Sequence, residues 1–124
     1  MQLSQNPTKQ EGATFGEITD SIENKVTVQS SSEHRNIPII APFGLTYSPP
    51  IGENTVLLHS GEKFISTGVF MKNKKLKPGE LMLYSQSGAN ILLNNHGEII
   101  LTSSGGAKII LDKSGKIFLN NCVL

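Results

Sequence analysis

The sequence predicts an all-β protein, and three observations support this fold class. Twelve of the 124 residues are glycine, only 6% are aromatic and tryptophan is absent, a composition that favours turns and short strands over helices. From Thr14 onward, short runs of β-prone residues alternate with turn signals. Beyond residue 78, glycines recur at a constant interval, which is typical of a repeat built from short strands.

Two strand pairs are predicted in the first half of the chain. Residues 14–22 and 25–30 are separated by Glu23-Asn24, which suits a tight hairpin. Residues 54–59 and 63–70 form a second pair around a short glycine-containing turn. Four or five such strands within about 65 residues can close into a small barrel. Periodicity alone leaves open whether this is an OB-type barrel or another small β fold.

Two other segments of this half are not predicted to be strands. Residues 1–13 are mostly polar and show no periodic pattern, so we expect a flexible N-terminal segment unless a partner orders it. Residues 37–50 contain four prolines, which oppose a central strand and favour an ordered, extended connection.

The second half is an internal repeat. Glycines stand at positions 79, 88, 97, 106 and 115, nine residues apart. The apolar triplets give a full unit of eighteen residues, because residues 80–83, 98–101 and 116–119 align with one another, as do residues 89–93 and 107–111. Each half-unit predicts a strand of about five residues closed by a polar, glycine-containing turn.

The repeat also predicts an oligomer. In each triplet the outer two residues share a face, as Leu81 and Leu83 do, while Met82 points the other way. Both faces are then apolar, and one meander can neither cover them nor pair its own outer edges. Several copies winding together would do so, and three chains forming a triangular prism are the simplest closure. The predicted trimer core consists of Leu81, Leu83, Ile91, Leu93, Ile99, Leu101, Ile109, Leu111, Ile117 and Leu119.

Charge, cysteine content and hydropathy exclude several function classes. Eleven basic and ten acidic residues give a formal net charge of +1, so specific nucleic-acid binding is not expected. Cys122 is the single cysteine, so no intrachain disulfide can form. The polar residues after Met1 do not resemble a signal peptide, and no apolar run approaches the roughly 20 residues of a membrane span. We expect a soluble product made in a cytoplasm.

Four segments together resemble one family. The segments are residues 41–50 (APFGLTYSPP), 52–58 (GENTVLL) and 76–84 (LKPGELMLY), followed by Gly88 with residues 91–93. They resemble stretches that occur in the same order in Mu-type phage baseplate assembly proteins. The order and spacing agree across roughly residues 14–115. The resemblance implies an OB-fold head over residues 14–75 and a C-terminal, intertwined triple-stranded β-helix over residues 76–124, assembled as a homotrimer.

The resemblance also implies a role. It points to a structural central spike, not an enzyme, in the baseplate of a contractile phage tail or a related injection system. The head would dock on hub or tube proteins, and the needle would make transient contact with the target cell envelope while piercing it. The expected location is the virion, after synthesis in the host bacterial cytoplasm.

His96 and Cys122 are the candidate metal ligands, although no metal or cofactor is expected. Many related spikes end in a His-x-His pair that binds iron, whereas this chain ends in Asn-Asn-Cys-Val-Leu, so an apolar plug or a separate tip protein is expected instead. Three copies of His96 around an axis could coordinate a metal, but the equivalent position, Ser114, favours a solvated turn residue. Cys122 could bind metal or oxidise near the tip, and we favour its packing as an apolar residue.

Two further patterns have simple interpretations. Ser60, His59 and Asp20 are the residue types of a catalytic triad, but the glycine pattern of a nucleophile elbow does not surround Ser60. His59 and Ser60 are also adjacent, and neighbouring residues of a strand point to opposite faces. Lysines at 72, 74, 75 and 77 could contact an acidic partner or phosphate, and a solvated linker is the favoured interpretation.

Two alternative functions remain open. An OB-like head could be a binding module for a single strand or a sugar, which would need exposed aromatic side chains. The head offers five aromatic residues for this, Phe15, Phe43, Tyr47, Phe64 and Phe70. Strand alternation is expected to turn several of these five side chains inward. A short β-solenoid adhesin would usually need more repeats. The spike explains both halves of the chain together.

Overall fold

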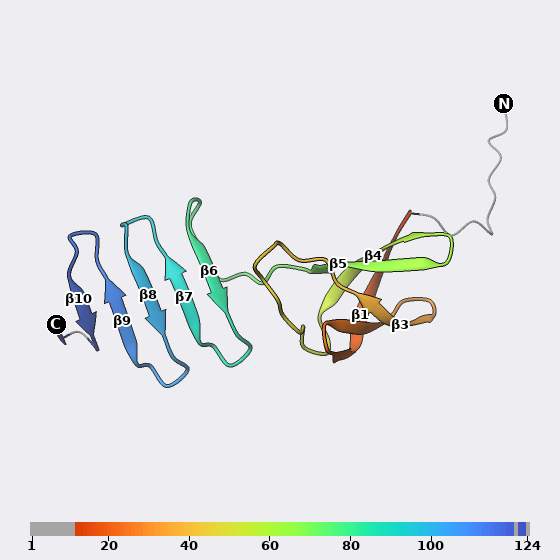
Figure 1. Ribbon diagram of the computed structural model, residues 1–124, viewed down its shortest axis with the longest axis horizontal. Coiled ribbons are helices and arrows are strands. Elements are labelled where there is room, and N and C mark those ends of the chain that lie inside the picture. Colours follow the sequence, from red (N-terminus) through yellow and green to blue (C-terminus); the bar gives the residue numbers. More distant parts are fainter. Residues whose placement is uncertain (1–11, 121, 124) are drawn as a thin grey trace, which may run out of the picture. The chain divides into compact units, whose positions relative to one another are not determined.

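The computed structural model describes residues 12–120 and 122–123, and these residues form β-strands, turns and loops without a helix. The chain divides into unit 1, Met1–Met71, and unit 2, Lys72–Leu124 (Figure 1). This division falls four residues before the predicted end of the head at residue 75. The flexible segment predicted over residues 1–13 lies outside the described residues, except that Gly12 and Ala13 already belong to the first strand.

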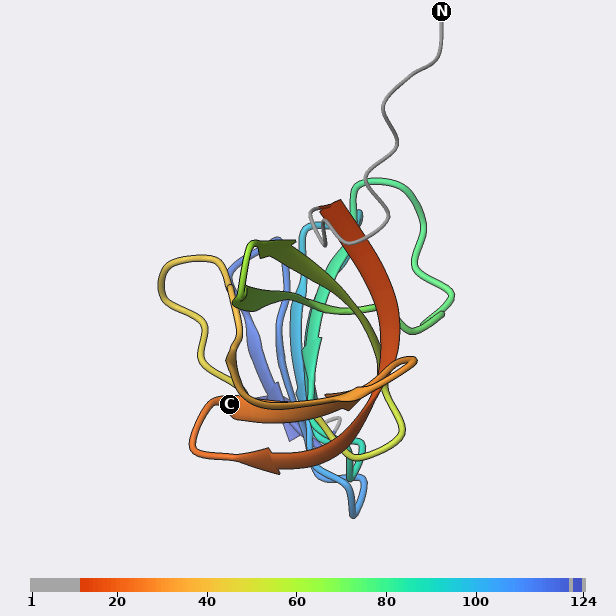
Figure 2. The ribbon, with the colours of Figure 1, turned by 90° about the vertical axis from the view of Figure 1, so that its right-hand side faces the viewer.

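Unit 1 is one strongly curled, five-stranded antiparallel sheet with the order β3-β2-β1-β4-β5 (Figure 2). Its strands are β1 (Gly12–Ile22), β2 (Lys25–Gln29), β3 (Glu33–Pro38), β4 (Asn54–Ser60) and β5 (Lys63–Val69). The two outer strands approach each other, because Ile39 forms a parallel bridge with Ser66 and the Ile40 N–H donates to the Ser66 carbonyl at 2.9 Å. The predicted strand pairs are confirmed, and β3 is an additional strand.

Local sequence explains the curl. Glu23 and Asn24, at φ values of 51° and 65°, form the turn whose twist suits the β1–β2 hairpin. An extra residue interrupts the β2–β3 register near Asn36, which has a φ of 57°, and the β4–β5 register near Gly68, which has a φ of 113°. Such bulges bend a strand and increase its twist. The sheet can therefore wrap around its own inner face.

The core of unit 1 lies inside this curl. It consists of Ile18, Val26, Val28, Ile37 and Leu57, each at most 6% exposed, and Ile39, Phe64 and Val69 pack against it.

Two buried hydroxyl groups within this curl are satisfied by one another and by the bulge. The Thr55 hydroxyl donates to the Gly68 carbonyl at 2.6 Å, and Thr55 Oγ1 lies 2.7 Å from Ser66 Oγ. The Gly68 N–H in turn donates to Ser66 Oγ at 3.2 Å. Because buried polar groups are costly only when unpaired, this network fixes the bulge without a net penalty.

Unit 2 is a six-stranded antiparallel meander in which each strand pairs with its chain neighbours. Its strands are β6 (Leu81–Tyr84), β7 (Asn90–Leu93), β8 (Ile99–Thr102), β9 (Lys108–Leu111), β10 (Ile117–Leu119) and β11 (Cys122–Val123). The five predicted repeat strands are confirmed to within one or two residues at each end. The short strand β11 is additional.

The repeating glycines stand where the turns need them. Gly79, Gly88, Gly97, Gly106 and Gly115 all have positive φ values, between 79° and 101°. In the Asn94 turn, the Gly97 N–H donates to the Asn94 carbonyl and the Asn94 N–H donates to the Glu98 carbonyl, both at 3.2 Å. The same pair of bonds recurs in the turns that begin at Ser85, Ser103 and Asp112. The nine-residue spacing is therefore the length of one strand plus one such turn.

Candidate assembly surface

The ten predicted core residues gather on one face of unit 2, which we call the ten-residue face. The register places Leu81 opposite Leu93 and Leu93 opposite Ile99, and the same pairing continues to β10. Directly paired residues point to the same side of a sheet. The outer triplet residues therefore form two parallel columns across five strands, as the alternation predicted.

This face is not covered by the chain itself. Nine of its ten side chains are 36–53% exposed, and Leu101 is half-buried. No described residue of unit 2 is fully buried. A hollow of about 680 Å³ follows the column of Leu83, Ile91, Leu101, Ile109 and Leu119. A sheet of one layer with a continuous aliphatic face lacks the second layer that domains normally use to exclude water.

The opposite face of unit 2 differs from the prediction that both faces need a partner. Its apolar residues form one central column, Met82, Leu92, Ile100, Ile110 and Phe118, and all five are already half-buried. Polar residues flank that column, for example Asn90 opposite Thr102 and Thr102 opposite Lys108. This face can therefore meet water, and the need for cover falls on the ten-residue face.

Polar turns eighteen residues apart contact one another along one side of the meander. Glu80 Oε1 accepts from the Lys77 N–H at 3.0 Å and Oε2 accepts from the Asn95 N–H at 3.1 Å, while Asn95 Nδ2 donates to the Pro78 carbonyl at 3.0 Å. These bonds, first from Lys77 and then from Asn95, lower the pKa of Glu80 below its usual value. The turns thus fix the stacking of successive repeats.

Asp112 organises the last described turn of this kind. Its Oδ1 accepts from the Lys116 N–H at 2.8 Å, from the Ser114 hydroxyl at 2.8 Å and from the Ser114 N–H at 3.0 Å. The Lys116 backbone bond and then the Ser114 hydroxyl bond lower the pKa of Asp112. At the equivalent position, Asn94 Oδ1 accepts from the N–H groups of His96 and Glu98, both at 3.0 Å. The turn therefore needs a side-chain oxygen at this position to accept backbone N–H groups, and a neutral amide serves as well as a charged carboxylate.

The two candidate metal ligands lie apart in the fold. His96 is exposed in the Asn94 turn. Cys122 is exposed, pairs with Leu119 in register and so lies on the side of the ten-residue face. Within residues 12–120 and 122–123, no three His, Cys, Asp or Glu side chains gather as a metal-binding group. The packing predicted for Cys122 therefore depends on a partner.

The structure does not bring Ser60, His59 and Asp20 together. His59 pairs with Gly12 at one end of β1, while Asp20 lies eight residues further along that strand, which is roughly 27 Å of extended chain at the usual rise. His59 Nε2 instead lies 3.2 Å from Thr14 Oγ1, and its ring packs on Phe64 at 5.0 Å. A catalytic triad of these residues is excluded by their separation.

The lysine-rich segment begins unit 2. Residues 72–77 are exposed, and Lys74 Nζ lies 4.2 Å from the centre of the Tyr84 ring. This cation–π contact holds the segment against β6. The positive charge of Lys74 thus already interacts with a side chain of the same chain.

The aromatic side chains of unit 1 depart from the expectation. Phe64 and Tyr47 are half-buried, but Phe15, Phe43 and Phe70 are 73%, 108% and 51% exposed. Phe15 lies on the outer side of the curled sheet, where strand alternation places it, and Phe43 lies in a loop. The sequence could not predict these positions. Alternation shows which residues of a strand share a face, but it does not show which of the two faces packs on the core.

No protein-family model and no curated protein sequence matches this chain. Among the residues that the structure describes, no helix is long and apolar enough to cross a membrane. A functional proposal therefore rests on the geometry of the two units together with the resemblance found in the sequence.

Proposed function

We propose that three copies of this chain form the central spike of a contractile tail baseplate or a related injection machine, with a structural rather than an enzymatic role. The observation that carries the proposal is the ten-residue face, a continuous aliphatic surface that a single chain leaves open. Three such sheets, with these faces turned inward, would make the walls of a triangular prism. In this proposal the ten-residue face forms the inner core of the homotrimer, and the opposite face of each sheet forms its outer surface.

The energy available from this arrangement is substantial. Burying one aliphatic side chain contributes roughly 1.5–3 kcal/mol. Ten side chains, each with about 40% of its surface left to bury, would supply roughly 6–12 kcal/mol per chain before the costs of association. Strand pairing is complete within each chain from β6 to β10, so side-chain packing between sheets would hold the prism together. In the proposed spike, three meanders would pack and twist together to give the intertwined β-helix that the sequence resemblance implies.

The proposed head is an OB-type barrel. The strand order β3-β2-β1-β4-β5 and the parallel bridge between Ile39 and Ser66, which joins the two ends of the sheet, support this assignment. The resemblance to baseplate assembly proteins over residues 14–115 supports the combination of such a head with a trimeric needle. In this proposal the head docks on hub or tube proteins and the needle leads towards the target envelope, with a separate tip protein as a further partner.

The short β-solenoid adhesin is less well supported. A solenoid repeats parallel coils, whereas the strands of unit 2 pair antiparallel with their immediate neighbours. The antiparallel meander gives each chain one wall of an assembly instead of a closed coil.

Light scattering of the purified full-length chain tests the trimer. We expect a mass near three times 13.4 kDa. Ile109→Asp should abolish the trimer, because it places a charge in the centre of the ten-residue face. The neighbouring Lys108→Asp should leave the trimer unchanged, because Lys108 is exposed and strand alternation turns its side chain away from that face. A monomeric wild-type chain, or a trimeric Ile109→Asp variant, would contradict the proposal.

Location in the particle tests the role itself. Antibodies against the chain should label the baseplate end of contractile tails purified from cells that produce it. Labelling along the sheath, or particles that lack the chain, would assign the trimer to another structure.

A further inference from the structure

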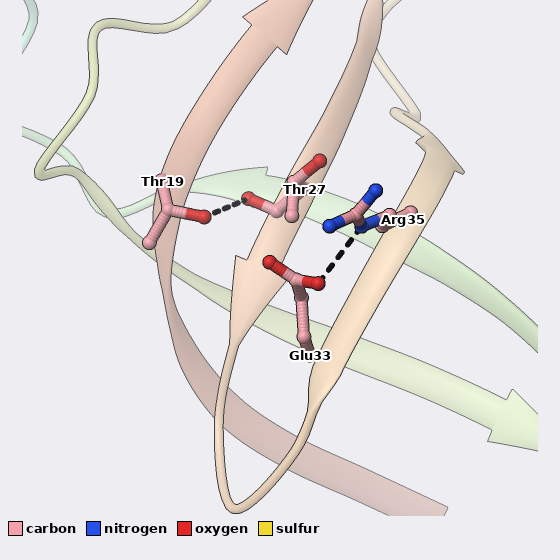
Figure 3. Close-up of polar contacts among 4 residues, drawn as sticks. All are labelled: Thr19, Thr27, Glu33 and Arg35. Carbon is pink, nitrogen blue, oxygen red and sulfur yellow. Dashed lines mark hydrogen bonds and ion pairs between the residues drawn. The ribbon is translucent and has the colours of Figure 1, made fainter.

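The outer surface of the unit 1 sheet is divided into a polar half and an apolar half. Over β1, β2 and β3 it carries Thr19, whose hydroxyl donates to the Thr27 carbonyl at 3.4 Å, and Arg35, whose Nε donates to Glu33 Oε1 at 2.8 Å (Figure 3). Over β1, β4 and β5 the register gathers a different set, which we call the aromatic patch. It consists of Phe15, Val56, Leu58, Ile65 and Phe70.

The aromatic patch has the properties of a protein-binding surface. The rings of Phe15 and Phe70 lie 6.0 Å apart at an interplanar angle of 17°, and Phe15, Phe70 and Leu58 are 73%, 51% and 43% exposed. Aromatic side chains held by neighbouring apolar groups are typical of interface hot spots. A platform for single-stranded nucleic acid combines aromatic rings with cationic groups, whereas the register neighbours here are aliphatic. The patch therefore favours a protein partner.

A complementary feature stands elsewhere on the same unit. Phe43 and Gly44 occupy the centre of a β-turn closed by the Leu45 N–H, which donates to the Pro42 carbonyl at 3.0 Å. Gly44, at a φ of 92°, allows this turn, and Phe43 is fully exposed at its tip. A ring at the tip of a closed turn loses little conformational freedom when it is buried by a partner.

The rest of the loop is tied to the β1–β2 hairpin. Thr46 Oγ1 donates to Asn24 Oδ1 at 3.4 Å, and the hydroxyl oxygens of Ser48 and Ser21 lie 2.7 Å apart. In Figure 2 this loop, which follows β3, extends from one side of unit 1, and the first half of β1 lies on the other side. The loop that carries Phe43 and the half of β1 that carries Phe15 thus lie on different sides of unit 1.

We propose that Phe43 of one chain packs against the aromatic patch of the next chain, so that three copies of unit 1 close into a ring. This inference rests on the proposed trimer. A cyclic trimer uses head-to-tail contacts, so each chain must offer two different surfaces that fit one another. The exposed turn and the aromatic patch are two such surfaces, and each would cover apolar side chains of the other. The ring gives the trimer a second interface, independent of the ten-residue face.

Cross-linking through introduced cysteines tests this contact. In a Cys122→Ser background, a chain carrying both Phe43→Cys and Leu58→Cys should give linked dimers and trimers with a short bismaleimide, and each single variant should give none. As a matched control, Phe43→Cys combined with Thr27→Cys on the polar half should also give none.

Light scattering on the same samples separates the two proposals. A trimeric mass without cross-links would overturn the ring and leave the spike intact, whereas a monomeric mass would overturn the spike and the ring together. Cross-links that extend beyond three chains would also overturn a closed ring.

Phe43→Ser and Phe15→Ser provide an independent measurement. Each should raise the concentration at which the trimer dissociates by about tenfold or more, because each removes an aromatic residue from the same contact. An effect of Phe15→Ser without one of Phe43→Ser would overturn the pairing. Binding of oligothymidylate or a short glucan that Phe15→Ser abolishes, with no cross-linking, would instead make the patch a ligand platform.

Discussion

At the scale of single residues, Gly16 shows how closely the strands of unit 1 approach. A Cβ atom at this position would lie 2.4 Å from Val28 Cγ1, a distance at which one of the groups must move. Val28 is fully buried between Ile18 and its other core neighbours, so it has little room to yield. The glycine is required by packing here, in contrast to the turn glycines of unit 2, which are required by their positive φ angles.

Gly16→Ala is therefore expected to destabilise unit 1. Forcing an extra methyl group into a packed core costs about 1–3 kcal/mol, and the loss should appear as a lower denaturant midpoint of the full-length chain. Gly105→Ala is the matched control, because a Cβ there would meet nothing closer than Ser103 Oγ at 3.9 Å. Equal midpoints for the two variants would show that β1 and β2 are less tightly packed than described.

At the scale of elements, the turns of unit 2 are held by side-chain acceptors at their first position. Asn94 and Asp112 occupy equivalent positions in the repeat, and each accepts two backbone N–H groups. Ser103, in the intervening turn, accepts from the Ala107 N–H at 3.1 Å. The strands therefore begin and end at fixed residues, which keeps every outer triplet residue on the same face.

The lowered pKa of Asp112 predicts a loss of stability in acid. Because the folded state favours the ionised carboxylate, its contribution is present above the unfolded pKa of about 4 and is lost as pH falls through the lower folded value. Asp112→Asn should unfold near the wild-type temperature at pH 7 and lose less stability between pH 4 and pH 2, as Asn94 already shows that an amide fits. Asp112→Ala should be less stable at both pH values. Identical acid sensitivity of the wild-type and Asn variants in thermal melts would refute this role.

The sequence predicted unit 2 better than unit 1, for physical reasons. A spacing of nine residues leaves room for one strand and one turn, so the glycines determined both the strands and the face on which Leu93 and Ile109 lie. Strand β3 was missed because residues 33–36 (EHRN) lack apolar alternation, and its pairing with β2 depends on a bulge at Asn36. The contact between Asn95 and Glu80 could not be predicted, since it depends on how turns stack in three dimensions.

At the scale of the whole molecule, the two units satisfy their apolar residues in different ways. Unit 1 buries five core side chains within its own curl, whereas unit 2 has no fully buried side chain among its described residues. Unit 1 can therefore retain its fold as a monomer, and unit 2 depends on association in the proposed trimer. We therefore expect the stability of residues 72–124, more than that of unit 1, to depend on the protein concentration.

Limited proteolysis should separate the units. Lys72, Lys74 and Lys75 are exposed at the start of unit 2, in a stretch without strand pairing, so trypsin should cut there first. Mass spectrometry should then find two stable fragments, and light scattering should find the C-terminal fragment as a trimer. Digestion that begins within β7, β8 or β9 would show that the repeat is not protected by association.

The repeat of unit 2 has a consequence for how its length can change. Each eighteen-residue unit adds two strands, or about 9.6 Å at the usual spacing, and returns the chain to the same side of the sheet. An insertion or deletion of eighteen residues preserves the register, the faces and the exit direction, whereas a change of nine reverses the exit direction. Duplication of one unit therefore lengthens this element by a fixed step and leaves the strand register unchanged.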